Sequence, residues 1–191
     1  MTSRQASSAT PKVVCLGFHK TGTTTFGRCM KILGLRHRSV HPNSFLHFLH
    51  GRIDVLLETM RHYDSFDGWP LTLVYRDLYS RFSESLFVPT TRSTDAIWLE
   101  SLTRHVDRLI PGVTSYRPNV YRRSDPVRNP DNYLQRNSQH NREVRAFFAD
   151  KSSQFIDVCW EREDGWPELC CPLSRPVPSI AFPHLNASPV S

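Results

Sequence analysis

The sequence predicts an α/β fold with three layers and a central parallel sheet. The run PKVVCL at residues 11–16 is short and apolar on both faces, as expected for a strand inside a parallel sheet. Strand-like runs of this kind alternate with helical patterns along the chain. The turn GFHKTGTT at residues 17–24 joins the first strand to the first helix, which is where α/β folds bind phosphate.

Length and composition favour one globular domain. The 191 residues, 39% of them hydrophobic, suffice for a single core. We expect a disordered leader at 1–11, a domain at 12–185 and a C-terminal tail at 186–191. The five cysteines are an odd number and form no CxxC pair, which indicates neither a disulfide framework nor a zinc site.

The formal charge of +6 suits an anionic partner: nucleic acid, an anionic membrane or a small molecule. No recognition helix or RNP-type strand is visible, so a nucleic-acid-binding protein is the weaker alternative. No apolar run is long enough to span a bilayer, and the polar start lacks the apolar centre of a secretory signal. A soluble cytoplasmic protein without a membrane partner is therefore expected.

The first half of the chain shows three helical patterns and a turn-rich segment. The helix that starts at Thr23 has an apolar face and ends at Gly34. The elements that follow are a strand within 35–41, a helix from 53 to about 63, a turn at 63–70 (YDSFDGWP) and a helix over 71–82.

The second half is expected to be interrupted by one long loop. Pro89 weakens the strand at 85–92 for a central position in the sheet. The further elements are a helix over 95–109 stopped by Pro111 and Gly112, a long loop at 112–132, a helix over 140–148, a last strand at 154–160, and a proline-rich segment from 175 that wraps the surface.

The turn at 17–24 differs from the P-loop of nucleotide triphosphatases in the position of its lysine. The P-loop order is Gly, four residues, Gly, Lys, then Ser or Thr. Gly17 and Gly22 keep that spacing, but Thr23 stands in the lysine position and Lys20 lies inside the loop. A divergent P-loop kinase or NTPase is therefore the alternative rather than the leading hypothesis.

Metal ligands for a kinase are also missing from the predicted strand ends. Kinases and GTPases hold Mg²⁺ with an acidic residue at the end of another strand. The 85–92 strand ends in Arg92, and Asp157 falls in mid-strand. His41, His47 and His50 have no cysteine or carboxylate partners at ligand spacing. The site is thus expected to contain positive charge and hydroxyls and no metal, which suits transfer of a group such as sulfuryl.

The segment VVCLGFHKTGTTTFG resembles the 5′-phosphosulfate loop of sulfotransferases that use 3′-phosphoadenosine 5′-phosphosulfate (PAPS). The family pattern is aromatic, any residue, Lys, Ser/Thr, Gly, Ser/Thr, Ser/Thr, which residues 18–24 match. Further segments are similar to the compact bacterial-type members: DSFDGWPLTLVYRDLYSRF, LFVPTTR followed by WLESLTRH, HNREVRAFF, and DGWPELC through FPHLN. The resemblance implies a P-loop NTPase-like sulfotransferase fold, PAPS as the cofactor and PAP as its product.

The resemblance also implies which residues bind the cofactor. Lys20 would neutralise charge on the bridging oxygen as the sulfuryl group leaves. Arg92 matches the arginine that binds the 3′-phosphate. Its partner serine would be Ser101, one residue beyond the family position, which Glu100 occupies, or else Ser93. The phosphosulfate would be held by the loop residues His19, Lys20, Thr21, Gly22, Thr23, Thr24 and Thr25.

A general base for the acceptor is the remaining requirement. Larger cytosolic members of the family carry a histidine just before a proline, but SFDGWP has no histidine. Asp67 is the nearest candidate and Asp64 the alternative, and both also suit plain turn chemistry. The acceptor is expected to be a hydroxyl or amine of a small molecule or glycan, bordered by 35–52 and 112–132.

Overall fold

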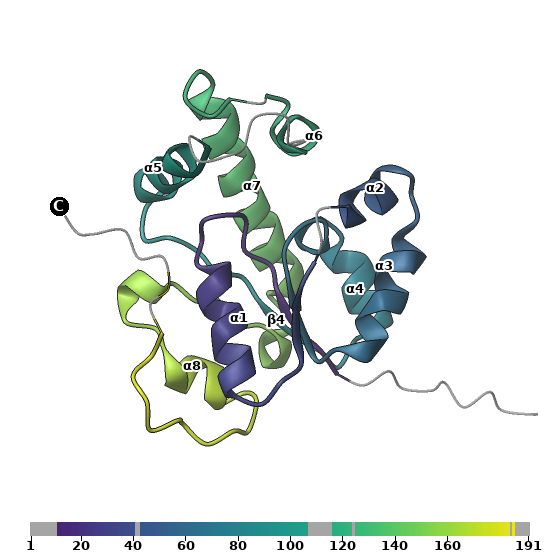
Figure 1. Ribbon diagram of the computed structural model, residues 1–191, viewed down its shortest axis with the longest axis vertical. Helices are drawn as coiled ribbons and strands as arrows, with labels where there is room; N and C mark the ends of the chain where they lie inside the picture. Colours follow the sequence, from purple (N-terminus) through teal and green to yellow (C-terminus); the bar gives the residue numbers. More distant parts are fainter. Residues whose placement is uncertain (1–10, 41–42, 107–115, 124, 184, 186–191) are drawn as a thin grey trace, which may run out of the picture.

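A four-stranded parallel sheet forms the centre of the computed structural model, which describes residues 11–40, 43–106, 116–123, 125–183 and 185 (Figure 1). The strand order is β2-β3-β1-β4, and every pairing is parallel. The strands are β1 (Val13–Cys15), β2 (His37–Ser39), β3 (Ser65–Asp67) and β4 (Leu86–Val88). The predicted α/β class is therefore confirmed.

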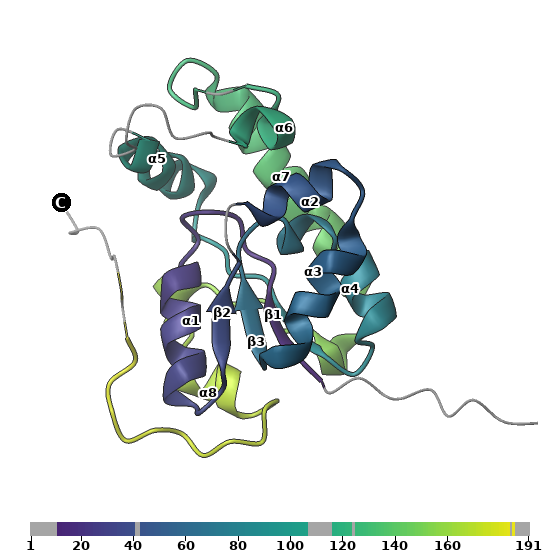
Figure 2. The ribbon, with the colours of Figure 1, turned by 45° about the vertical axis from the view of Figure 1, so that its right-hand side comes forward.

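Helices cover both faces of this sheet, so the fold has the three predicted layers (Figure 2). Alternate residues of β1 point to opposite faces. Val13 and Cys15 pack against α1 (Thr23–Ile32) and α8 (Trp166–Cys170). Val14 packs on the other face, in a core that includes residues of α4 (Tyr75–Arg81) and α7 (Pro130–Phe148), with α3 (Ile53–Thr59) outside them.

A third apolar cluster lies beyond the carboxyl ends of the strands, around Phe18. It joins α2 (Ser44–Leu49), α5 (Asp95–Val106), α6 (Arg117–Tyr121) and the first turn of α7 (Figure 1). Four short 3₁₀ helices complete the described elements: η1 (Met60–His62), η2 (Leu71–Leu73), η3 (Ser152–Gln154) and η4 (Trp160–Arg162). The third apolar cluster thus packs beside the carboxyl edge of the sheet, where the loop at 17–24 lies.

The predicted turn at 63–70 is wrong in its first half, which contains β3. The Phe66 side chain is buried and β3 pairs with a strand on each side, so long-range pairing overrides the local preference of serine and aspartate for turns. The turn begins afterwards, at Gly68, whose φ is 95°. β3 thus places Asp67 at the edge of the sheet where the loop at 17–24 lies.

The predicted loop at 112–132 is also wrong in part. It contains α6, and α7 begins at Pro130, ten residues before the predicted helix start at 140. Pro118 and Pro130 occupy the start of these helices, where a missing N–H does no harm. The rings of Tyr121 and Tyr133 stack at 4.0 Å and hold the two helices together. The end of the predicted helix at 95–109 and residues 111–115 lie outside the described residues.

The predicted strand at 154–160 is reduced to two isolated bridges, Phe87 to Phe155 and Thr90 to Val158. The N–H groups of Ile156 and Val158 donate to β4 and Pro89. Pro89 has no N–H with which to return a bond, so the ladder is interrupted. The segment still runs beside β4 and extends the sheet edge.

The proline-rich segment from 175 wraps the α8 side of the molecule, as predicted (Figure 1). Trp166 Nε1 donates to the carbonyl of Ile180, and Phe182 packs between Trp160 and Trp166. The predicted leader at 1–11 and tail at 186–191 lie outside the described residues, apart from Pro11, and the domain limits stay a prediction. All five thiols are unpaired. Across the described residues, no helix has the length and apolar character needed to cross a membrane.

Candidate active site

The loop at 17–24 crosses the carboxyl edge of the sheet between β1 and α1. Lys20 and Gly22 have positive φ values of 68° and 95°, which turn the chain sharply into the helix. The helix starts with the bond from Phe26 N–H to the Gly22 carbonyl. The N–H groups of Thr23, Thr24 and Thr25 precede it and have no acceptor inside the helix. They offer a cluster of anion-binding donors beside Lys20.

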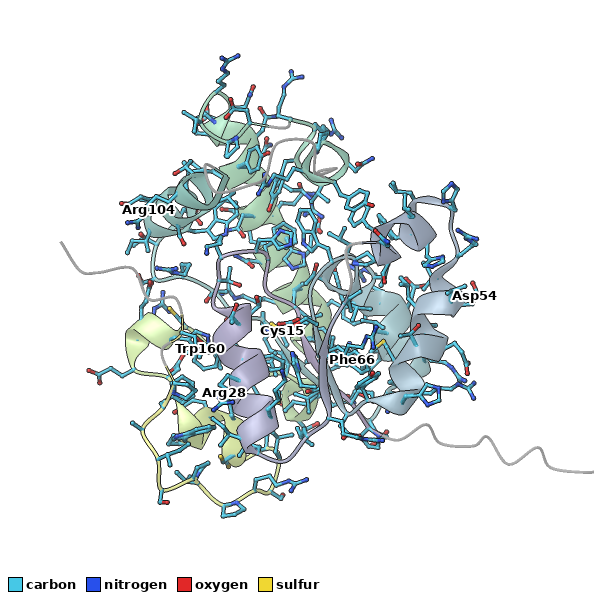
Figure 3. All side chains as sticks on the ribbon, viewed as in Figure 1. Cys15, Arg28, Asp54, Phe66, Arg104 and Trp160 are labelled. Atoms are coloured by element: carbon cyan, nitrogen blue, oxygen red, sulfur yellow. The ribbon has the colours of Figure 1, made fainter. Side chains whose placement is uncertain are left out.

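Two glycines let the loop pass between crowded neighbours. A Cβ at Gly17 would lie 1.9 Å from Thr90 Oγ1, and one at Gly22 would lie 2.3 Å from Trp160 Cδ1. Trp160 also donates from Nε1 to the Gly22 carbonyl at 3.2 Å. Figure 3 shows Trp160 directed from its own segment toward α1. The loop conformation is thus fixed by contacts on both sides.

The hydroxyls of the loop divide into two groups. Thr21 Oγ1 donates to the Phe18 carbonyl at 2.6 Å and lies 2.7 Å from Thr90 Oγ1, buried in the protein. Thr25 is buried too and accepts from the N–H of Leu185 at 3.2 Å. Thr23 is half-buried and Thr24 exposed. The hydroxyls of Thr21 and Thr25 are already engaged, so these residues can reach a ligand only through main-chain N–H groups. Thr23 and Thr24 can also use their hydroxyls.

Arg92, just after β4, connects the loop to a carboxylate, that of Glu161. Its Nη1 donates to the Lys20 carbonyl at 3.2 Å, and its Nη2 forms an ion pair with Glu161 Oε1. The other carboxylate oxygen of Glu161 accepts from Ser93 N–H at 2.8 Å and from Ser93 Oγ at 2.5 Å. Burial alone would raise the pKa of Glu161, but the hydrogen bonds from Ser93 and Arg92 outweigh it, so its pKa is lowered.

The two candidate serines differ in their positions. Ser93 shares the Glu161 carboxylate with Arg92. Ser101 is buried in the middle of α5, 6% exposed. The geometry therefore joins Ser93 to Arg92 through the carboxylate of Glu161.

Asp67 ends β3 on the α1 face of the sheet and is 4% exposed. Burial raises the pKa of its carboxyl, although a hydrogen bond from Ser39 opposes this effect. His37 Nε2 lies 3.8 Å from Asp67 Oδ2, but burial lowers the pKa of His37 to about 4. The imidazole is therefore neutral at pH 7 and the contact is not a salt bridge. The expectation that no acidic residue ends a strand beside the loop is therefore wrong, because Asp67 is the last residue of β3, next to β1.

Asp64 lies at the opposite, amino end of β3. Its carbonyl accepts from Val13 N–H at the start of β1. Its carboxylate accepts two hydrogen bonds of 3.0 Å from the Arg36 guanidinium, and these bonds, above all, lower its pKa. The length of the strand separates Asp64 from the loop, about 10 Å at 3.3 Å per residue.

An aromatic wall, formed by His19, Phe45, Trp69, Trp98 and Tyr116, borders the loop. The His19 ring lies 4.2 Å from the ring of Trp69, and the His19 carbonyl accepts from Trp98 Nε1 at 2.9 Å. Phe45 of α2 stacks on Tyr116 at 4.6 Å. The two segments predicted to border the acceptor, 35–52 and 112–132, therefore meet in this wall.

The sequence-based predictions missed Thr90, Trp160 and Glu161. A general rule could have found them, because residues that follow parallel strands gather at the edge where the first loop lies. Within the part of the chain that the structure describes, no group of three or more His, Cys, Asp or Glu side chains could hold a metal ion. His41 lies outside that part, and His50 Nδ1 lies 2.7 Å from the carbonyl of Leu46.

A comparison with protein families gives a match. The family model described as a sulfotransferase domain matches residues 12–127 and 114–189. These ranges include the loop, Arg92, both candidate carboxylates and the Trp160–Glu161 segment. A comparison with curated proteins found no match.

Proposed function

The chain belongs to the sulfotransferase-domain family, and on that premise we propose that it moves the sulfuryl group of PAPS to a hydroxyl or amine of a small molecule or glycan. The observation that supports this proposal best is the hydrogen bond of 3.2 Å from Arg92 Nη1 to the Lys20 carbonyl. PAPS has a phosphosulfate and a 3′-phosphate on one ribose, so its site needs two neighbouring sets of anion-binding donors. This contact joins two such sets.

The residues present fit the charged groups of PAPS. Lys20 and the main-chain N–H groups that start α1 suit the phosphosulfate. Arg92 and Ser93 suit the 3′-phosphate, since together they already bind a carboxylate, that of Glu161. Arg92 Nε is buried without a hydrogen-bond partner, which leaves one more donor for an anion. Ser101 is the alternative to Ser93.

Bound PAPS would supply an activated sulfuryl group. In this proposal the Lys20 ammonium neutralises the negative charge that grows on the bridging oxygen during transfer. The start of α1 contributes its positive dipole end to the same region. His19, Thr21, Gly22, Thr23, Thr24 and Thr25 hold the phosphosulfate, with Thr21 and Thr25 acting through the main chain.

We assign the general base to Asp67. It lies at the loop end of the strand next to β1, and burial raises the pKa of its carboxyl, which makes it a stronger base than an exposed aspartate. The carboxylate would take the proton of the acceptor hydroxyl or amine. Asp64 is the weaker candidate because it lies at the far end of β3, paired with Arg36.

The aromatic wall is the proposed acceptor border. The His19 ring is half-buried and packs on Trp69, whereas the rings of Trp69 and Phe45 are buried in the third apolar cluster. The ring face of His19 is therefore the part of the wall open to a ligand. Such surfaces pack against sugar faces or planar rings, while a hydroxyl or amine faces the transferred group.

A divergent P-loop kinase is the second candidate, favoured by Asp67 at the end of a strand adjacent to β1. A thermal-shift experiment separates the two functions. Under the sulfotransferase proposal, adenosine 3′,5′-bisphosphate (PAP) raises the melting temperature in the presence of EDTA. Stabilisation by Mg-ATP but not by PAP would support the kinase instead. A screen of hydroxyl and amine acceptors with labelled PAPS then identifies the acceptor class.

A further inference from the structure

We infer that Glu161 is an internal competitor for the 3′-phosphate of the cofactor and thereby sets cofactor affinity. Its carboxylate holds the donors that a 3′-phosphate would use, and it must leave them when the cofactor binds. The inference rests on the proposed function.

The carboxylate of Glu161 is bound as a ligand anion would be. It receives the Ser93 N–H at 2.8 Å, the Ser93 hydroxyl at 2.5 Å and the Arg92 guanidinium. An arginine combined with a main-chain N–H and a hydroxyl is a typical anion-binding set. Arg92 also contacts the loop, so the set lies next to the phosphosulfate region.

Glu161 and a 3′-phosphate cannot share these donors. The Ser93 N–H and hydroxyl each have one hydrogen to give, and both now point to one carboxylate oxygen. A phosphate bound by Arg92 would also place its negative charge against that of Glu161, and like charges in contact repel. Competition for the same donors follows.

The segment that carries Glu161 is held in place, so only the side chain needs to move. Trp160 donates to the Gly22 carbonyl at 3.2 Å, and Cys159 N–H donates to Asp164 Oδ2 at 2.7 Å. On the other side, Thr91 N–H donates to the Val158 carbonyl at 2.9 Å. The Glu161 side chain is 30% exposed and can rotate into solvent.

The competition has a ligand-specific consequence. A ligand with a 3′-phosphate must displace Glu161, whereas AMP, which lacks that phosphate, leaves it in place. If Glu161 holds the donors in about 90% of free molecules, the apparent affinity for PAP is reduced about tenfold. The affinity for AMP is unchanged.

The test is calorimetric titration of the full chain with PAP and with AMP. Glu161→Gln and Glu161→Ala are compared with wild type, and Glu163→Gln, exposed on the same segment, is the matched control. Both Glu161 variants are expected to bind PAP about tenfold more tightly and AMP equally well. The melting temperature of the free variants should fall, since Arg92 loses its charge partner.

The direction of the PAP effect decides the outcome. Weaker PAP binding by both variants would show that Glu161 orients Arg92 for the phosphate, and would overturn the competition. Unchanged PAP binding would overturn it as well. A wild-type protein that does not bind PAP contradicts the proposed function itself, which distinguishes that failure from a failure of the inference.

Discussion

The two proposed anion-binding regions of this protein are linked by the contact of Arg92 with the Lys20 carbonyl but are built differently. The loop at 17–24 is contiguous in sequence and offers main-chain N–H groups, with its shape set by positive φ at Lys20 and Gly22. The Arg92–Ser93 region uses side chains, and its anion partner, Glu161, lies 68 residues from Ser93. The first region is a local motif, whereas the second depends on the whole fold.

This difference determines which donors an internal carboxylate can occupy in place of a ligand. Main-chain donors at a helix start cannot rotate toward an internal partner, so their direction is fixed by the helix. Side-chain donors can be claimed by a neighbouring carboxylate, as Glu161 does with Arg92 and Ser93. We therefore expect substitutions in the loop to affect chemistry most and substitutions around Arg92 to affect cofactor affinity most.

The largest expected effect is that of Lys20→Ala. Removing the ammonium should lower kcat by about 10³, the upper range for loss of one charge-stabilising donor. Thermal stability should change little, since Lys20 is half-buried at the surface of the loop. Steady-state rates with labelled PAPS measure the effect, and Arg28→Ala, exposed on α1, is the control. Undiminished turnover by Lys20→Ala would overturn its assigned role.

A paired comparison of two aspartates tests the base. Asp67→Asn should lower kcat by about 10², whereas Asp64→Asn should leave kcat nearly unchanged. The pH profile adds a second measurement. The wild-type kcat should rise with pH through the pKa of Asp67, which burial raises above its usual value, because only the carboxylate accepts a proton. Asp67→Asn should lose this limb, and a limb retained in that variant would assign the base elsewhere.

A smaller effect distinguishes the two kinds of loop hydroxyl. Thr21→Val removes a buried hydroxyl with two partners and should lower the free energy of unfolding by about 1–3 kcal/mol, with little change in the cofactor Kd. Thr23→Val removes a half-buried hydroxyl and should leave the free energy of unfolding nearly unchanged, while PAP binds several-fold more weakly. Urea unfolding and calorimetry measure the two quantities. Equal stability losses would show that the division of the threonines is wrong.

The features that could be predicted from the sequence are those formed by contiguous residues. The strand, loop and helix over residues 11–34 are contiguous, and their pattern identified them together with Lys20. Arg92 was identified by the family resemblance, and its contact with the loop required the fold.

Long-range pairing explains most of what was missed. β3 contains Ser65 and Asp67, which prefer turns, and it forms because it pairs with strands on both sides. Glu161 was missed although the strand before it was predicted, because its partner Ser93 lies 68 residues away in the chain and no local pattern marks their contact. The sequence left Ser101 and Ser93 as alternatives, because Ser101 lies one residue beyond the family position and the contact of Ser93 with Glu161 spans 68 residues.

The central claim is that the loop and Arg92 together bind one nucleotide at two anionic groups. Calorimetric titration with PAP and AMP in the presence of EDTA tests it most directly, on wild type, Arg92→Ala and the exposed control Arg104→Ala. We predict that wild type and the control bind PAP at least about tenfold more tightly than AMP, and that Arg92→Ala removes this difference. Equal affinities for PAP and AMP in wild type, or a difference that survives in Arg92→Ala, would contradict the claim.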